Sequence, residues 1–245
     1  LHWDGRNWDA ASAGADIDCT ALFGSATDDV WMFARTGTVW HYDGSRWAVQ
    51  KQTFPGVSFL GGAAVSRTAA YAVGSGGTIL VWDGTMWSAV PKLVSTVLRT
   101  AWAATPSDVW VVGDSGVILR GQGTTWSLIP KPTSASFYSV HGTSASNVHL
   151  VGAELWYWNG ASFAQFPRAS ATPSLPSSVN LRDVVVRTDG TALAVGDFGA
   201  VVQYRQGAWS VLSYGDTRSL VRMSPATATD AWVVGEAQTI LRYSP

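Results

Sequence analysis

Arginine, carboxylate and tyrosine side chains recur at places in this sequence where together they could bind a ligand. The candidate ligand-binding residues are Arg35, Arg99, Asp114, Tyr138, Arg182, Asp197, Arg222 and Glu236. A guanidinium group donates paired hydrogen bonds to carboxylate oxygens, and a carboxylate accepts hydrogen bonds from hydroxyl groups. A polar pocket built from these residues would hold a sugar or the charged group of a peptide. The alternative is that the acids are solvated turn residues and that the arginines pair with them.

Several kinds of catalytic and metal chemistry require motifs that this sequence lacks. It contains no serine-centred elbow, no His-x-x-x-His metal pair and no glycine-rich phosphate loop. The single cysteine, Cys19, excludes an intrachain disulfide bond and a cysteine-rich zinc site. The four histidines, which we expect on separate repeats, are predicted to have structural roles. We therefore expect no cofactor and no bound metal.

The composition excludes further classes of protein. The 16 basic and 17 acidic residues give a net charge of −1, without the basic surface that nucleic-acid binding requires. Hydrophobic residues make up 47% of the 245-residue chain, which is enough to bury a core and to exclude disorder. No apolar run approaches the roughly 18 residues of a membrane span, so we expect no membrane insertion. The three lysines against 13 arginines, with many small residues, favour an extracellular, cell-surface or periplasmic location.

The candidate residues belong to a sequence motif that repeats six times along the chain. Two clear copies read Asp-Val-Trp-Val-Val-Gly at 108–113 and Asp-Ala-Trp-Val-Val-Gly at 230–235. The equivalent anchor positions, 39 to 44 residues apart, are Trp31, Tyr71, Trp110, His149, Leu193 and Trp232. A sequence period of this size indicates a solenoid, a propeller or another repeat fold.

Two further landmarks keep a fixed phase with these anchors. An apolar residue lies twelve positions before each anchor, as Cys19, Phe59, Leu98, Phe137, Leu181 and Leu220. An outer aromatic residue follows 14 or 16 positions after five of the anchors, as Trp47, Trp87, Trp126, Phe163 and Trp209. A glycine stands three residues before four of the outer aromatics and two before Trp209, often after Asp or Asn, which predicts a tight hairpin with positive φ at the glycine.

Each repeat is predicted to form four short β-strands. In the third repeat these strands run near 98–103, 109–113, 117–120 and 125–129, with turn-forming residues between them. No segment of about 10 to 15 residues shows a helical period, so we expect helices to be nearly absent.

The two ends of the chain share one repeat between them. Asp-Gly-Arg-Asn-Trp at 4–8 matches Asp-Gly-Ser-Arg-Trp at 43–47, and the sixth repeat ends before its own outer tryptophan. Residues 1–10 are therefore predicted to complete the last blade. We predict a single all-β domain over residues 1–245, a six-bladed β-propeller of four-stranded blades whose ring is closed by the N-terminal strand.

Most of the tryptophans and turn acids have a predicted structural role. The tryptophans recur at fixed strand positions, which predicts that they pack between blades. Trp102 is unlike its counterparts in the other repeats, and we expect it to pack or to line the channel. Four residues directly before the second strand are expected to close turns with their side chains: Asp29, Asp108, Asn147 and Asp230.

The repeat resembles bacterial propeller repeats of the BNR/Asp-box kind. The resemblance rests on Val-Trp-Val-Val-Gly-x-x-Gly-x-Ile-Leu at 109–119, followed by Gly-x-x-Trp at 123–126. The pattern is also similar to kelch repeats, which share the glycine of strand two and the outer tryptophan. The segment 43–47 lacks the leading serine of a full Asp-box, and kelch repeats carry a double glycine where this chain has Val-Gly. The resemblance implies a propeller fold and leaves the ligand unspecified.

The predicted fold places the candidate residues around one mouth of the central channel, where rigid blades carry variable loops. We predict a non-catalytic recognition propeller that binds a glycan or a protein there, as a monomeric domain of a longer chain. One alternative is a structural domain of a larger bacterial surface protein. The loop at 163–179 is the longest, and we expect it to lean over the mouth or to contact a partner.

A sialidase-like glycoside hydrolase is the enzymatic alternative. In that hypothesis Arg99, Arg182 and Arg222 bind a substrate carboxylate. Tyr138 would be the nucleophile, and Glu236 or Asp114 the acid. Against it, most loops are too short to build the deep cleft that such chemistry requires.

Overall fold

The computed structural model describes residues 2–3, 6, 8–9, 18–130, 132–167, 174–213, 215–225 and 230–243. The chain forms two compact units, Leu1–Ser95 and Thr96–Pro245, which are described separately. Regular structure in the described residues is antiparallel β-sheet with three short 3-10 turns, in agreement with the predicted scarcity of helix. Among the same residues, no helix has the length and hydrophobicity needed to cross a bilayer.

The first unit contains two four-stranded sheets and one two-stranded sheet. The two-stranded sheet pairs β1 (His2–Trp3) with β2 (Trp8–Asp9). The four-stranded sheets comprise β3 (Cys19–Ala26), β4 (Asp29–Ala34), β5 (Thr38–Tyr42) and β6 (Trp47–Thr53), then β7 (Phe59–Ser66), β8 (Ala69–Gly74), β9 (Ile79–Trp82) and β10 (Trp87–Ala89). Each four-stranded sheet is a meander in which consecutive strands are neighbours.

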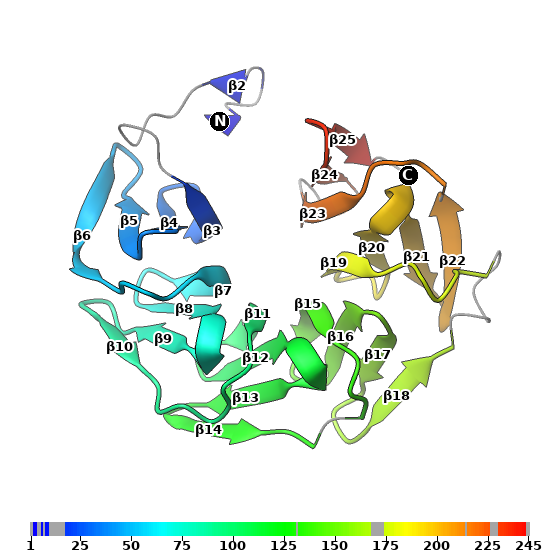
Figure 1. Cartoon of the computed structure of the whole chain (residues 1–245), viewed down its shortest axis with the longest axis horizontal. Helices are drawn as coiled ribbons and strands as arrows, with labels where there is room; N and C mark the ends of the chain where they lie inside the picture. Colours follow the sequence, from blue (N-terminus) through cyan, green and yellow to red (C-terminus); the bar gives the residue numbers. More distant parts are fainter. Residues whose placement is uncertain are drawn as a thin grey trace. The chain divides into compact units, whose positions relative to one another are not determined.

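The second unit contains three four-stranded sheets and one three-stranded sheet (Figure 1). The first two comprise β11 (Leu98–Thr105), β12 (Asp108–Gly113), β13 (Ile118–Gln122) and β14 (Thr125–Leu128), then β15 (Phe137–Ser144), β16 (Asn147–Gly152), β17 (Leu155–Trp158) and β18 (Phe163–Phe166). The others comprise β19 (Leu181–Val186), β20 (Ala192–Gly196), β21 (Val201–Arg205) and β22 (Ala208–Ser213), then β23 (Leu220–Pro225), β24 (Ala231–Gly235) and β25 (Ile240–Tyr243). The first strands β11, β15, β19 and β23 contact one another in that order.

The fold is a six-bladed β-propeller with four-stranded antiparallel blades, as the repeat predicts. The predicted strands of the third repeat agree with β11 to β14 to within two residues at each end. In the last blade the described residues supply the three strands β23 to β25. Completion of this blade by residues 1–10 stays a prediction, and five of those residues lie outside the described part of the chain: Leu1, Asp4, Gly5, Asn7 and Ala10.

The hairpins between third and fourth strands have the geometry that their dipeptides predict. Gly44 has a φ of 95°, a conformation that glycine adopts without steric cost. Oδ1 of Asp43 accepts hydrogen bonds from the hydroxyl and amide of Ser45 and from the amide of Arg46. These bonds, led by the one from the Ser45 hydroxyl, hold the pKa of Asp43 well below its usual range.

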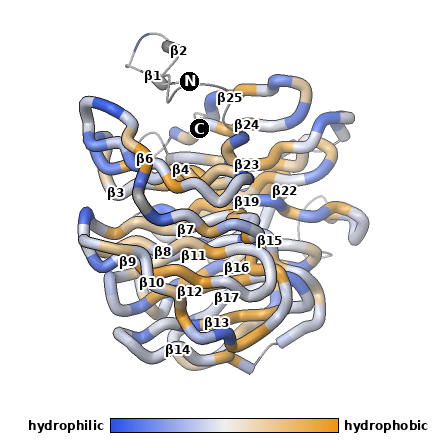
Figure 2. Tube along the Cα trace, turned by 60° about the vertical axis from the view of Figure 1, so that its left-hand side comes forward, coloured by the Kyte–Doolittle hydropathy of each residue, from blue (hydrophilic) through white to orange (hydrophobic). Residues whose placement is uncertain are grey.

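The strands are mainly apolar and the connecting turns mainly polar (Figure 2). Trp31, Trp87 and Trp110 are almost fully buried, as predicted for tryptophans that pack between blades. Trp87 of β10 meets Trp31 of the preceding blade edge to face, with ring centroids 5.0 Å apart. Trp102 packs against the hydrophobic cluster around Trp110, and its centroid lies 5.8 Å from that of His141. The predicted packing role is therefore confirmed for these tryptophans.

Part of the longest loop is buried, and the prediction for the histidines is corrected. Part of the 163–179 loop belongs to the core, since Leu175 and Val179 are buried in the cluster between the blades of β15–β18 and β19–β22. These residues therefore anchor the loop to the blades. The histidines do not all lie on separate repeats, because His141 on β15 is the direct cross-strand partner of His149 on β16.

Candidate ligand-binding site

A β-bulge near the start of each first strand positions the central candidate residues. The pairing of β11 with β12 shifts register between Leu98 and Thr100, which leaves Arg99 as the extra residue. The same shift occurs in the other blades of the second unit, at Tyr138, Arg182 and Val221. A bulge re-aims the side chain of its extra residue away from the regular alternation of the strand. The position after the apolar anchor therefore presents its side chain differently from the rest of the strand.

A backbone contact brings this bulge beside the residue that follows strand two. The amide of Asp114 donates a 2.9 Å hydrogen bond to the carbonyl of Val97, and Asp197 makes the same bond to Asn180. The glycine before each acid permits the approach, because a Cβ added at Gly113 would lie only 2.2 Å from the Val97 carbonyl oxygen. Gly113 has an extended φ of −164°, so it is required for space and not for its backbone angle.

Two of the predicted arginines form ion pairs with two of the predicted acids. Arg99 Nε lies 2.5 Å and Nη2 3.2 Å from the two carboxylate oxygens of Asp114, a bidentate arrangement. Arg182 Nε lies 2.7 Å from Oδ1 of Asp197 in the equivalent place two blades later. The arginine side chains remain about one-third exposed, at 34% and 37%. The alternative in which arginines pair with the turn acids therefore holds for these four residues in its pairing, although Asp197 is buried and is not a solvated turn residue.

Tyr138 lies between these ion pairs. The Cζ atom of Arg99 is 4.8 Å from the centroid of the tyrosine ring, and that of Arg182 is 4.9 Å away. Both distances are within the range of cation–π attraction. The three residues come from adjacent first strands, β11, β15 and β19, so the fold joins positions 99, 138 and 182 into one cluster.

The electrostatics of the Asp197 pair favour the charged state. Burial raises the pKa of Asp197, but hydrogen bonds from Arg182 and Asn180 outweigh it and bring the pKa below its usual value. Asn180 donates to Oδ2 of Asp197 from its amide at 3.1 Å and from its side chain at 2.9 Å. The carboxylate is thus already satisfied, and it orients the guanidinium group of Arg182.

The remaining predicted residues have other contacts. Arg222 is exposed, and its Nη1 donates to the carbonyls of Arg182 at 3.4 Å and Val221 at 3.1 Å. Glu236 accepts a 3.0 Å hydrogen bond from the amide of Ser219. Arg35 belongs to the first unit and pairs with Asp18, with both side chains more than 60% exposed. Within the second unit the structure therefore groups Arg99, Tyr138 and Arg182 and places Arg222 against Arg182.

The predicted site residues do not include Asp183, whose carboxylate connects the strands that carry this cluster. Its Oδ1 accepts from the hydroxyl of Ser139 at 2.6 Å, and its Oδ2 accepts from the amide of Met223 at 2.7 Å. Asp183 thereby links the first strands of three consecutive blades. Asp183 and Ser139 both stand two residues after an apolar anchor, and this shared position is the signal that could have identified them.

The residues before the second strand form two kinds of contact. Asn147 donates to the hydroxyl of Thr143, and Asp29 accepts from the hydroxyl of Ser25, both across the turn into strand two as predicted. Asp108 instead accepts a bidentate ion pair from Arg120 on strand three, at 2.7 and 2.9 Å. Asp29 also accepts from His41, and Asp230 from Arg242, both on strand three. The reason is register: residues of strand three lie opposite strand two, so a basic side chain there reaches the acid directly.

The histidine pair lies on two neighbouring strands of one blade, β15 and β16. Nδ1 of His141 accepts a 3.1 Å hydrogen bond from the amide of Val186. Nδ1 of His149 is buried without a hydrogen-bond partner among the described residues, within an aromatic cluster. In the part of the chain that the structure describes, no group of three or more His, Cys, Asp or Glu residues could hold a metal ion.

The arrangement of Arg99, Tyr138 and Arg182 is suited to recognition. Each guanidinium group carries five N–H donors, of which the carboxylates occupy only some. The aromatic face of Tyr138 is covered in part by the two cations.

Structural comparison places the chain among β-propellers. It is similar to a structure described as YCF48 bound to D1 peptide, with a TM-score of 0.74, 17% identity, and coverage of 99% of this chain and 82% of that one. It is similar to the WD40 propeller of Doa1, with a TM-score of 0.72, 15% identity, and coverage of 94% and 80%. The extracellular domain of BT4673 from B. thetaiotaomicron gives a TM-score of 0.73 and 15% identity, with coverage of 95% of this chain and 32% of that one.

These similarities define the fold class of the chain, a β-propeller. The sequence matches no protein-family model and no curated protein sequence. The resemblance to BNR/Asp-box or kelch repeats therefore stays a prediction.

Proposed function

We propose that the protein is a non-catalytic recognition propeller that binds an exposed segment of another protein across Arg99, Tyr138 and Arg182. The observation that carries this proposal is the position of Tyr138 between two guanidinium groups, at 4.8 and 4.9 Å. Tyrosine and arginine side chains supply much of the energy at protein interfaces, because they offer large contact area and several hydrogen bonds.

The ion pairs support recognition because they hold the arginines in place. Asp114 and Asp197 fix the guanidinium groups before a ligand arrives, so less side-chain entropy is lost on binding. The two carboxylates also neutralise the charge of Arg99 and Arg182, which disfavours non-specific binding of anions. Specificity then depends on the shape and hydrogen bonds of the ligand.

The comparisons support a protein ligand over catalysis. A propeller of similar fold is described as bound to a peptide, and another similar propeller is a WD40 domain. The sialidase-like alternative requires three arginines free to bind one carboxylate, whereas Arg99 and Arg182 are engaged by Asp114 and Asp197. An extracellular or cell-surface location belongs to the same proposal, since one similar propeller is an extracellular domain.

A glycan is the second candidate ligand. Arginine and aspartate side chains beside an aromatic ring are able to hydrogen-bond sugar hydroxyls while the ring contacts the sugar face. The same residues would then serve a different ligand class, and the experiment below separates the two.

The test is selection of a phage-displayed library of random 12-residue peptides on the immobilised protein, with a glycan array in parallel. Peptides that bind the wild type are measured against Tyr138→Ala and Arg182→Gln, and we expect each variant to weaken binding at least roughly tenfold. Arg242→Gln is the matched control, since Arg242 pairs with Asp230 at the opposite end of a second strand. It should bind as the wild type does.

Three results would overturn this proposal. Peptide binding unchanged in both variants would place the site elsewhere. Saturable binding on the glycan array alone would make the glycan the ligand. Binding in neither assay would favour the structural domain. Thermal unfolding of every variant shows whether a loss of binding reflects a loss of fold.

A further inference from the structure

Phe198 adopts a backbone conformation that large side chains rarely take. It lies in the 3-10 turn η4 (Asp197–Gly199), directly after Asp197, with a φ of 57°. The equivalent turns elsewhere hold small residues at this position, namely Gly76, Ser115 and Ala237, all with positive φ. Phenylalanine at this position therefore carries more backbone strain than the small residues found in the same turn of three other repeats.

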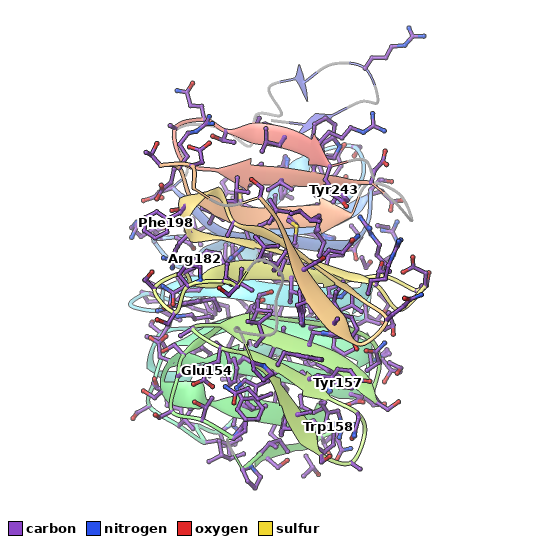
Figure 3. The ribbon with its side chains drawn as sticks, turned by 90° about the vertical axis from the view of Figure 1, so that its right-hand side faces the viewer. Glu154, Tyr157, Trp158, Arg182, Phe198 and Tyr243 are labelled. Carbon is purple, nitrogen blue, oxygen red and sulfur yellow. The ribbon has the colours of Figure 1, made fainter. Side chains whose placement is uncertain are left out.

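The ring of Phe198 is also substantially exposed. Its exposed fraction is 45%, and that of Val221 on the adjoining strand β23 is 38%. η4 and β23 are in contact, so the backbone segments that carry these two exposed apolar side chains lie close together. The carbonyl of Phe198 accepts hydrogen bonds from the amides of Gly215 and Asp216, both at 3.0 Å, and these bonds fix the turn. Figure 3 shows Phe198 and Arg182 on the same side of the blades, away from Tyr157 and Tyr243.

A cation borders this apolar surface. Arg222 follows Val221 and forms no ion pair among the described residues, and its guanidinium group is held by the carbonyls of Arg182 and Val221. Burial raises the pKa of the nearby Asp183, and the charge of Arg222 counteracts this. Asp183 already accepts hydrogen bonds from Ser139, Val184 and Met223, so it forms no direct bond with Arg222.

We propose that Phe198, Val221 and Arg222 form a subsite that selects an apolar side chain followed by a carboxylate in a peptide ligand. The subsite rests on the proposed function, because it adjoins Arg182 of the main site and names the chemistry of the bound segment. Phe198 and Val221 contact the apolar side chain. Arg222 pairs with the carboxylate of the adjacent Asp or Glu, for which its planar donors are suited.

Charge complementarity supports this occupant. Arg99 and Arg182 are matched by Asp114 and Asp197, so Arg222 is the cation of this surface whose hydrogen bonds go only to neutral carbonyls. An acidic peptide supplies a carboxylate that accepts hydrogen bonds directly from this guanidinium group, whereas a neutral sugar supplies none. The strained turn has a direct use in this arrangement, since it presents an aromatic ring on a rigid backbone.

The experiment is an NMR titration of the whole chain with the peptide acetyl-Gly-Phe-Glu-Gly-amide. We expect saturable shifts of the amides of residues 198 and 221–223. Two matched peptides replace Glu by Gln or Phe by Ala, and each should bind roughly tenfold more weakly. Phe198→Gly and Arg222→Gln should weaken binding of the parent peptide by a similar factor.

A stability measurement separates binding from structure. Phe198→Gly should melt at a temperature no lower than the wild type, because glycine adopts the positive φ without strain. The matched control is Ala237→Gly, which relieves the same backbone angle in the next blade and should leave peptide binding unchanged. A lower melting temperature for Phe198→Gly would show that the ring has a structural role.

Failure of the subsite is distinguishable from failure of the proposed function. If peptides selected from the library depend on Tyr138 but bind Phe198→Gly and Arg222→Gln as well as the wild type, the main site stands and the subsite is wrong. Equal binding of the Glu and Gln peptides would also overturn the role of Arg222.

Discussion

The hydroxyl of Ser139 donates a 2.6 Å hydrogen bond to Oδ1 of Asp183, across the boundary between two consecutive blades. Oδ2 of the same carboxylate accepts from the amide of Met223 in the next blade, at 2.7 Å. Asp183 therefore fastens β19 to the first strand on each side of it. These are the strands that carry Tyr138, Arg182 and Arg222, so the stability of this contact and the geometry of the site are linked.

The first prediction is that Ser139→Ala destabilises the fold in a pH-dependent way. Burial raises the pKa of Asp183 above its ordinary 3.8, although Arg222 and the hydrogen bonds counteract this. Because the pKa of Asp183 is raised in the folded state, its contribution to the free energy of unfolding is largest at pH values below its unfolded-state pKa. That contribution is lost as the pH rises through the folded-state pKa. Above the folded-state pKa the carboxylate is ionised and depends most on its donors, so losing Ser139 should cost about 2 kcal/mol there.

The measurement is urea unfolding of the wild type and the Ser139→Ala variant at pH 7 and at pH 3.5. The difference in unfolding free energy between the wild type and the variant should shrink at pH 3.5. A protonated Asp183 loses less stabilisation than an ionised one when the Ser139 hydroxyl is removed. Ser127→Ala is the control, since its exposed hydroxyl makes only a 3.5 Å bond to a carbonyl. A difference that is equal at both pH values would contradict the prediction.

The second prediction concerns the buried imidazole of His149. Burial, reinforced by the charge of His141, lowers the pKa of His149 from 6.5 to about 4. A histidine with a lowered folded-state pKa costs stability as pH falls below its unfolded value, and the cost reaches its full size near the folded pKa. His149→Phe should remove this loss, which amounts to about 3 kcal/mol at pH 4. Equilibrium unfolding between pH 7.5 and 4 measures it.

The matched control for this variant is Leu193→Phe. Leu193 occupies the same anchor position in the next blade and is equally buried, but it has no proton to exchange. Its variant should keep the acid dependence of the wild type. If His149→Phe loses as much stability in acid as the wild type, His149 is not the group responsible.

The repeat made most of the fold predictable from the sequence. Strand positions follow from the fixed phase of apolar anchors and turn residues, and the hairpin glycines have the positive φ that their dipeptides indicate. The ion pairs of Arg99 and Arg182 were also within reach, because each arginine and its acid occupy equivalent positions in two repeats. These contacts are local to one blade, and the periodicity of the sequence records them.

Contacts between blades were harder to predict. The position of Tyr138 between two guanidinium groups depends on how neighbouring first strands align, and repeat spacing within one blade does not fix that alignment. The link from Asp183 to Ser139 has the same origin. The positive φ of Phe198 was not predictable either, because the turn overrides the preference of the residue.

One missed contact left a clear signal in the sequence. An acid before strand two occurs together with a basic residue twelve positions later, as in Asp108 with Arg120 and Asp29 with His41. Repeats without the base, such as the one with Gln203, have no acid at the first position. This covariation within one chain predicts the ion pair that the structure shows.

The third prediction tests the pair of Asp108 and Arg120. Both side chains are mostly buried, with exposed fractions of 13% and 17%, and Arg120 also lies 4.8 Å over the ring of Trp110. Arg120→Gln should cost about 3 kcal/mol, because it leaves a buried carboxylate without its cation. Asp108→Asn combined with Arg120→Gln should recover part of this loss. Thermal or urea unfolding of the two single variants and the double variant gives the coupling free energy.

An exposed ion pair provides the contrast. Arg35 and Asp18 are both more than 60% exposed, so Arg35→Gln should change the unfolding free energy by less than about 1 kcal/mol. Equal losses for Arg35→Gln and Arg120→Gln would show that burial does not decide the strength of these pairs.

The fourth prediction concerns the space that Gly113 leaves for the carbonyl of Val97. The first repeat has Ala34 at this position and still forms the equivalent 2.8 Å hydrogen bond, from Arg35 to Asp18, so a methyl group is tolerated after a small backbone shift. Gly113→Ala should therefore cost about 1 kcal/mol and Gly113→Val about 3 kcal/mol of unfolding free energy, as expected when a progressively larger side chain is forced into a filled space.

The same substitutions should affect ligand binding. Because the backbone shift displaces Asp114 from Arg99, both variants should weaken binding of the selected peptides, and valine should weaken it more than alanine. Gly207→Ala is the control for stability. Gly207 has a φ of 84° and open space around it, so this variant shows the cost of backbone strain without overpacking. Full binding by a Gly113→Val variant that is destabilised would show that the site does not depend on this approach of the two strands.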